Sequence, residues 1–230
     1  ITGDGRDEVF LTSMGDQLLQ IAQEDGTYTA APFEIGTYAH RPYFGDDGRP
    51  STGWHAQFGD VNNDGRPDLF ISKGNVDQMP SNAIYDPNNL LIQKSDGRFI
   101  EAGLSAGVAS KERSRGAALA DFDLDGRLDI LVLNRRAPIQ IYRNETENVG
   151  HWLKVKLTQD GGNRNAVGAR VKVGGDVQQI SIGGGHAGGQ SLPLHFGLGS
   201  SRTVNITVTW PDDVVSTHTV NADQTVNLHR

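Results

Sequence analysis

The sequence has 230 residues, a net charge of −7 and no cysteine, which excludes disulfide bonds and thiol chemistry. It contains no apolar stretch of about 18 residues that could span a membrane, and the acidic balance and lack of a basic cluster along the chain argue against a nucleic-acid partner. Its 29 glycines favour short strands and tight turns over helices.

The chain opens on a short acidic stretch that returns twice in fuller form. Residues Thr2 to Glu8 match positions 3 to 9 of a nine-residue loop, so we expect the true N-terminus to lie upstream. The complete copies are Asp60-Val61-Asn62-Asn63-Asp64-Gly65-Arg66-Pro67-Asp68 and Asp121-Phe122-Asp123-Leu124-Asp125-Gly126-Arg127-Leu128-Asp129. The near-equal spacing, 60 residues (64 − 4) and then 61 (125 − 64), indicates a repeated supersecondary unit.

Oxygen-bearing side chains at positions 1, 3, 5 and 9, with glycine at position 6, are typical of a calcium loop, because calcium takes six to eight oxygen ligands. Position 7 would offer only its backbone carbonyl. Glu8 departs from the aspartate expected at position 9, and the alternative for every loop is an acidic surface turn that binds no ion. The predicted Ca²⁺ ligands are Asp60, Asn62, Asp64, Arg66 and Asp68; Asp121, Asp123, Asp125, Arg127 and Asp129; and, in the truncated copy, Thr2, Asp4, Arg6 and Glu8.

The residues after each complete loop exclude an EF-hand, which needs glutamate at position 12 and flanking helices. That position holds Ile71 or Val132, each inside a short apolar run that is typical of a buried strand. The motif is therefore a loop followed by a strand.

Each repeat contains several strand-like segments, four in the second unit, which is the content of a β-propeller blade. The predicted strands are 8–12, 17–22 and 27–29 in the first unit, 53–59, 68–72, 89–93 and 97–101 in the second, and 116–120, 129–133 and 139–143 in the third.

These units resemble FG-GAP repeats, also called VCBS repeats. The resemblance covers residues 1–148, or about two and a half blades, and is carried by Phe58-Gly59-Asp60, Ala120-Asp121-Phe122-Asp123 and Asp96-Gly97-Arg98-Phe99. It implies calcium bound within each blade, as a structural ion, in a secreted or surface-displayed protein.

The pattern changes near His151, and residues 149–230 form a second predicted domain. Short alternating segments at 151–157, 169–173, 177–182, 192–196, 204–210, 217–220 and 225–228 predict a small antiparallel β-sandwich. The segment resembles the ASPIC/UnbV module through residues 163–171, His195-Phe196-Gly197-Leu198-Gly199 and Val208-Thr209-Trp210-Pro211. The predicted fold is therefore all-β, with partial propeller blades followed by a sandwich.

Several other residues invite a functional interpretation that their context does not support. The glycine-rich stretch around His186 lacks the strand, helix and lysine of a phosphate loop, so we expect a flexible surface loop. Ser191, His195 and Asp176 lack a nucleophile elbow. His55 alternates with its neighbours as a packed residue would. Asn144, expected to be exposed, and Asn205 lie in glycosylation sequons.

Together these features predict a calcium-stabilised extracellular structural or adhesive protein that is not an enzyme and contacts a protein or glycan ligand. The alternatives are a glycan-binding module that stacks sugars on Trp54, Tyr38 or Tyr43, and a fragment of a secreted polysaccharide-acting enzyme. The third unit lacks an outer strand, so its edge at 139–143 is expected to accept an upstream segment or a neighbouring copy, which would build a homo-polymer or filament.

Overall fold

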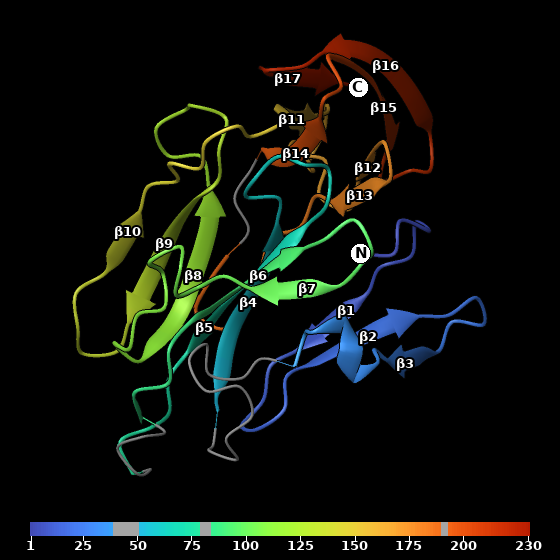
Figure 1. Cartoon of the computed structure of the whole chain (residues 1–230). Coiled ribbons are helices and arrows are strands. Elements are labelled where there is room, and N and C mark those ends of the chain that lie inside the picture. The colour runs from blue at the N-terminus through green and yellow to red at the C-terminus, as the bar shows by residue number, and fades with distance from the viewer. Residues whose placement is uncertain (39–50, 79–83, 190–192) are drawn as a thin grey trace.

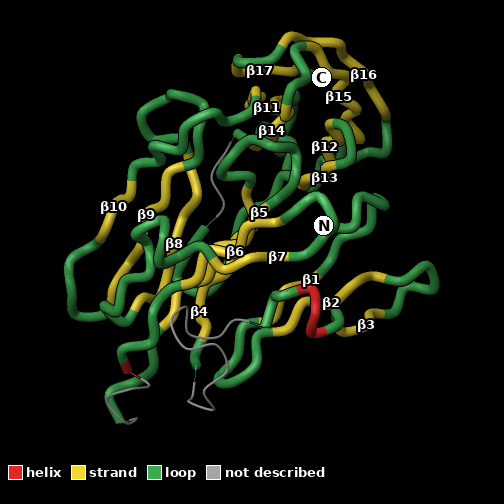
Figure 2. The backbone as a smooth tube through the Cα atoms, in the orientation of Figure 1, coloured by secondary structure: helices red, strands yellow, loops and turns green. Residues whose placement is uncertain are grey.

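The computed structural model describes residues 1–38, 51–78, 84–189 and 193–230. Its regular structure is almost entirely β-strand, arranged in five separate sheets (Figures 1 and 2). The predicted all-β class is confirmed, while Tyr43 and Ser191 lie outside the described residues.

Three antiparallel sheets correspond to the three repeats, in the orders β1-β2-β3, β4-β5-β6-β7 and β10-β9-β8. A 3-10 helix, Phe33–Ile35, follows the first sheet. The strands are β1 (Val9–Leu11), β2 (Leu18–Ala22), β3 (Tyr28–Ala30), β4 (Gly53–Gly59), β5 (Asp68–Lys73), β6 (Asn89–Gln93), β7 (Phe99–Glu101), β8 (Ser114–Ala120), β9 (Asp129–Asn134) and β10 (Gln140–Tyr142).

The second sheet packs between the other two, because β5 is apolar on both faces. Successive side chains of a strand point to opposite faces, and here Phe70 joins a core shared with the third sheet. Leu69 and Ile71 join a separate core with Phe10 of the first sheet. This continuous apolar run fixes the order of the three sheets.

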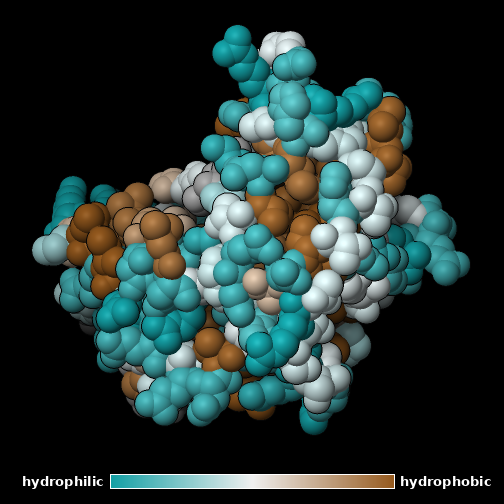
Figure 3. Space-filling view, turned by 90° about the horizontal axis from the view of Figure 1, so that it is seen from above, coloured by the Kyte–Doolittle hydropathy of each residue, from teal (hydrophilic) through white to brown (hydrophobic). Residues whose placement is uncertain are grey.

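The third sheet has three strands among the described residues, as the sequence predicts, and β10 forms its outer edge. Ile139 beside β10 and Ile141 within it are 58% and 62% exposed. Figure 3 shows apolar residues gathered on this side of the molecule. The third blade therefore presents an unpaired apolar edge.

Residues from His151 onward form the sandwich, with sheets β14-β11-β17 and β13-β12-β15-β16 around a core that includes Phe196, Ile206 and Trp210. The expectation of purely antiparallel strands is wrong for one pair. After β16 the chain crosses to the other sheet, where β17 runs parallel to β11. The strands are β11 (His151–Thr158), β12 (Arg170–Val173), β13 (Asp176–Gln179), β14 (Leu194–Gly199), β15 (Thr203–Thr209), β16 (Val215–Asn221) and β17 (Gln224–His229).

The sandwich sits on the acidic loops at one end of the blade sheets (Figure 1). The Gly199 N–H donates to the Asn63 carbonyl at 2.8 Å, and the Gly150 N–H donates to the Asn62 carbonyl at 3.1 Å. Arg170 pairs with Asp7, which lies within the first loop, at 2.6 Å. The two predicted domains are therefore joined through the predicted calcium loops.

The glycine-rich segment 183–189 is a surface loop, as the sequence predicts, and all of its residues except Gly185 are exposed. It packs against β4 and β8, where a methyl group on Gly185 would lie 2.8 Å from His55 Nδ1, and the His186 ring lies 4.8 Å from the Trp54 ring. At Gly185 and Gly188 a side chain would clash, because the backbone there lies directly on His55.

Candidate metal centres

The three acidic loops share one backbone conformation. The residues at positions 4 and 6 adopt left-handed φ angles, which glycine tolerates and other residues rarely adopt. At position 4 the angles are 77° for Gly3, 57° for Asn63 and 64° for Leu124; at position 6 they are 84° for Gly5, 86° for Gly65 and 89° for Gly126. The truncated first copy thus follows the same path as the complete loops.

Backbone N–H groups hold the carboxylates of the second loop. Asp60 accepts from the N–H groups of Asp64 and Gly65 at 3.0 and 2.6 Å. Asp68 accepts from Val61 at 3.0 Å and from Gln93, at the end of β6, at 2.9 Å. The loop is closed on itself and anchored to the sheet.

The third loop repeats this scaffold with the equivalent atoms. Asp121 accepts from the N–H groups of Asp125 and Gly126 at 3.0 and 2.9 Å. Asp129 accepts from Phe122 at 3.0 Å and from Asn144, just after β10, at 2.8 Å. Two loops of different sequence thus impose the same positions on their first and last carboxylates.

Three of the predicted ligands in the third loop converge. Oxygen atoms of Asp121, Asp123 and Asp129 all lie within 4.8 Å of one another. Clustered carboxylate oxygens are the donors that hard cations such as calcium prefer, so these residues fit a calcium ion.

The carboxylates at position 5 point elsewhere. Asp4 pairs with Arg6 at 2.6 Å, and the equivalent pairs Asp64–Arg66 and Asp125–Arg127 form in the complete loops. The sequence grouped these aspartates with the other ligands, but the structure does not place Asp125 in the converging group. The prediction that calcium is bound by the backbone carbonyl oxygens of Arg6, Arg66 and Arg127 stays a prediction.

The truncated loop brings Thr2 and Glu8 together. The Thr2 hydroxyl donates to Glu8 Oε1 at 2.9 Å, and the Glu8 side chain is 2% exposed. Asp4 accepts from the Arg6 N–H at 2.9 Å, as the position-5 aspartates do in the other loops. The longer side chain of Glu8 thus still turns back toward position 3.

The second loop holds two carboxylates whose charge is not compensated by any of the described residues. Burial raises the pKa of Asp60 to about 6, and the nearby Asp64 carboxylate adds to this. Burial likewise raises the pKa of Asp68 to about 7, with contributions from Asp60 and Asp64. Within the described residues neither Asp60 nor Asp68 has an ion-pair partner. A bound cation would supply the missing positive charge.

The third loop, in contrast, is supplied with positive charge by the chain. Lys154 Nζ, from β11 of the sandwich, lies 2.7 Å from Asp121 Oδ2, and both side chains are buried. Arg143 Nε lies 2.7 Å from Asp123 Oδ2. Sequence reasoning missed Lys154, since alternation shows only that it faces away from the sandwich core.

A second sandwich residue, His195, contacts the same loop. Its Nε2 lies 3.1 Å from the Gly126 carbonyl, and burial lowers its pKa to about 4, so the neutral ring donates this hydrogen bond. The Asn63 side chain donates to the same carbonyl at 3.0 Å, which links the second and third loops. Asp176 does not orient His195, because it accepts instead from Gln178.

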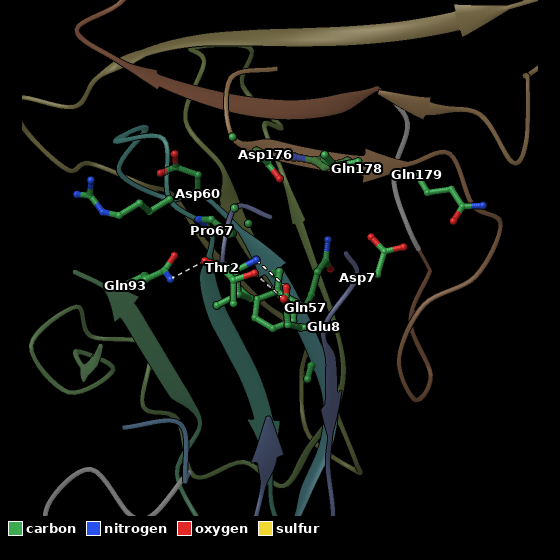
Figure 4. Close-up of a pocket in the computed structure, with 18 of the residues that line it drawn as sticks. Thr2, Asp7, Glu8, Gln57, Asp60, Pro67, Gln93, Asp176, Gln178 and Gln179 are labelled. Carbon is green, nitrogen blue, oxygen red and sulfur yellow. Dashed lines mark hydrogen bonds and ion pairs between the residues drawn. The ribbon is translucent and has the colours of Figure 1, made fainter. Parts of the chain in front are cut away.

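A cavity of about 730 Å³ is lined by residues of the first and second loops, β4 and β13 (Figure 4). Its polar lining includes Gln57, Gln93 and Gln178. Among the described lining residues, Asp176 is the one carboxylate that lies outside the three loops, and burial raises its pKa.

The other candidates are placed as follows. His55 is buried, as expected for a packed residue. The Trp54 ring is covered in part by Arg115, at 4.3 Å, and Tyr38 contacts Phe33. The prediction of a freely exposed Asn144 is wrong, because its Nδ2 donates to the Val61 and Leu128 carbonyls at 2.7 and 3.1 Å. Asn205 is exposed on β15.

Comparisons with known families agree with these two structural parts. Residues 1–71 match the model of the FG-GAP-like repeat, and residues 159–230 match that of ASPIC and UnbV. The two segments of the chain are thus similar to these two modules. Within the described residues, no helix is long and apolar enough to cross a membrane.

Similar proteins include cartilage acidic protein 1 from three vertebrates. The chain is 31% identical to the Xenopus tropicalis protein over 51% of its own length, 26% identical to the Mus musculus protein over 72%, and 27% identical to the Homo sapiens protein over 66%. The matched segments cover 20%, 26% and 24% of those proteins, so the chain spans at most about a quarter of each.

Proposed function

We propose that this chain is a calcium-stabilised structural and adhesive part of an extracellular protein, and that it is not an enzyme. The observation that carries the proposal is the repeated loop scaffold, in which Asp60, Asp68, Asp121 and Asp129 are fixed by equivalent backbone hydrogen bonds. The name of the similar cartilage proteins supports an extracellular setting.

Calcium would act as a structural ion in this arrangement. The loops that would hold it lie between the blade sheets and the sandwich, so an ion there stabilises both the turn and the junction. Extracellular calcium is present at millimolar concentration, which suffices for weak sites. The described residues that line the cavity offer one carboxylate outside the loops, Asp176, and this supports a non-enzymatic role.

The test is thermal unfolding of the full chain with and without calcium, together with calorimetric calcium titration. An ion that binds only the folded protein raises Tm by mass action, so chelation should lower Tm. In the double variant Asp60→Asn/Asp68→Asn, the rise in Tm that calcium causes should be smaller than in the parent chain. Asp96→Asn is the matched control, because Asp96 lies in a similar Asp-Gly-Arg turn with an exposed side chain. No calcium uptake and an unchanged Tm would refute the proposal.

The adhesive role is proposed to include strand addition at β10, which is favoured by the exposed Ile139 and Ile141 on an unpaired edge. The occupant proposed is a second copy of the chain. Sedimentation of the same samples should then show concentration-dependent assembly that Ile141→Lys abolishes. A chain that stays monomeric at all concentrations would rule this out.

A further inference from the structure

Four arginines gather at the end of the blade sheets that lies away from the sandwich (Figure 1). Arg113 and Arg115 lie at the start of β8, and Arg135 and Arg136 form the turn after β9. The Arg135 N–H donates to the Arg113 carbonyl at 3.1 Å, which brings the two pairs together. The sequence showed no basic cluster because these pairs are 20 residues or more apart.

A single carboxylate, Asp77, serves three of these arginines. One of its oxygens pairs with Arg113, and the other lies 3.1 Å from Arg135 and 3.0 Å from Arg136. The Arg135 contact lacks hydrogen-bond geometry, since its buried Nη1 has no hydrogen-bond acceptor. The single negative charge of Asp77 is therefore shared among three guanidinium groups, which leaves the cluster with excess positive charge.

Among the described residues, Arg115 adds positive charge without a carboxylate partner. Its guanidinium donates to the backbone carbonyls of Gly74 and Ser114, each at 2.8 Å, and stacks on Trp54 at 4.3 Å. Burial and then the charges of Arg135 and Arg113 lower its pKa, which reflects this crowding of cations. Four arginines and one aspartate leave a local charge of +3 (4 − 1) on a chain whose net charge is −7.

Two of the arginines occupy backbone positions that disfavour them. Arg113 and Arg136 have φ angles of 58° and 57°, in the left-handed region where this chain mostly uses glycine. Strain of this kind persists only where the surrounding structure enforces it, and such positions cluster at functional sites. The guanidinium groups of Arg113 and Arg136 are therefore held in the cluster at a cost in backbone conformational energy.

We propose that this arginine cluster binds the carboxylate or sulfate groups of an acidic polysaccharide. The planar guanidinium fork matches these oxyanions with two parallel hydrogen bonds. Arg136, at 69% side-chain exposure, faces solvent, and Arg135, at 35%, is partly exposed with its Nη1 buried. Asp77 holds the side chains together until an anion displaces it. A compact group of this kind suits a few anionic groups rather than a long phosphate track. The site is separate from the calcium loops and goes beyond their function.

The test measures binding of the calcium-loaded full chain to heparin oligosaccharides, which carry sulfate, and to oligogalacturonate, which carries carboxylate. Arg136→Gln should weaken binding about tenfold, the loss of one charge-assisted contact. Asp77→Asn should tighten binding, because it removes the internal competitor. Arg98→Gln is the matched control, since Arg98 is an exposed arginine paired with one aspartate elsewhere, and it should bind as the parent chain does.

Tm and calcium uptake of each variant show that it is folded, so failure of this proposal is distinguishable from failure of the calcium proposal. Tighter binding to one of the two oligosaccharides identifies the anionic group. Equal affinities of the Arg136→Gln and Arg98→Gln variants would overturn the proposal. Binding of duplex DNA as tightly as either polysaccharide would overturn it in favour of a nucleic-acid site.

Discussion

At the scale of single residues, equivalent carboxylates of the second and third loops differ in whether a cationic side chain pairs with them. Asp60 and Asp68 are buried without a cationic partner among the described residues. Asp121, equivalent to Asp60, pairs with Lys154, whose side chain is 9% exposed. A lysine that already neutralises a ligand reduces the electrostatic gain from binding calcium. The second and third loops should therefore differ in affinity.

Lys154→Gln tests this difference. Without calcium, the variant leaves Asp121 buried and unpaired, which should cost about 3 kcal/mol of unfolding free energy. With calcium, the ion takes over the role of the lysine, and affinity at the third loop should rise. The measured difference in Tm between calcium-loaded and calcium-free protein should consequently be larger than in the parent chain.

Lys156→Gln is the control for net charge, because Lys156 lies two residues along β11 and is exposed. It should unfold like the parent chain in both conditions. A Lys154→Gln variant whose response to calcium shrinks would show that the lysine supports the site rather than competing for it.

At the scale of elements, the glycine-rich segment 183–189 connects the sandwich with the inner strands of the blades. A methyl group on Gly188 would overlap the His55 ring, whereas one on Gly189 would meet no atom within 4 Å. The same chemical change therefore has different consequences at adjacent positions.

Gly188→Ala should destabilise the chain by about 1–3 kcal/mol, the cost of overpacking a close contact, and Gly189→Ala should be nearly neutral. Chemical denaturation of the two variants in calcium measures the contrast. Equal stability would indicate that the segment does not pack on His55 in solution.

Local patterns in the sequence predicted the strands well, because alternation and turn residues act within a few positions. The predicted 53–59 and 89–93 coincide with β4 and β6, and the acidic loops follow from their own spacing. Contacts such as Lys154–Asp121 and Gly199–Asn63 join residues far apart in the chain. No local pattern reports them, so the seating of the sandwich on the loops and the arginine cluster could not be foreseen.

At the scale of the whole molecule, the two ends of the blade sheets carry opposite charge. The acidic loops lie under the sandwich, and the arginine cluster lies at the far end (Figure 1). The junction between the two modules is thus built on buried carboxylates, so its stability should depend on protons as well as on calcium.

The calcium-free chain should become less stable as pH rises from about 5 to 8. The folded-state pKa values of Asp60 and Asp68, about 6 and about 7, lie above the ordinary value of 3.8. Above pH 4, roughly, the unfolded chain has released protons that the folded chain still holds, so stability falls until both carboxylates ionise near pH 7. Calcium requires the ionised forms, and its stabilising effect should grow over the same range.

Tm measured in calcium-free and calcium-containing buffers across this range provides the test. The Asp60→Asn/Asp68→Asn variant should flatten the calcium-free profile, and a calcium-free Tm that rises with pH would contradict the expectation.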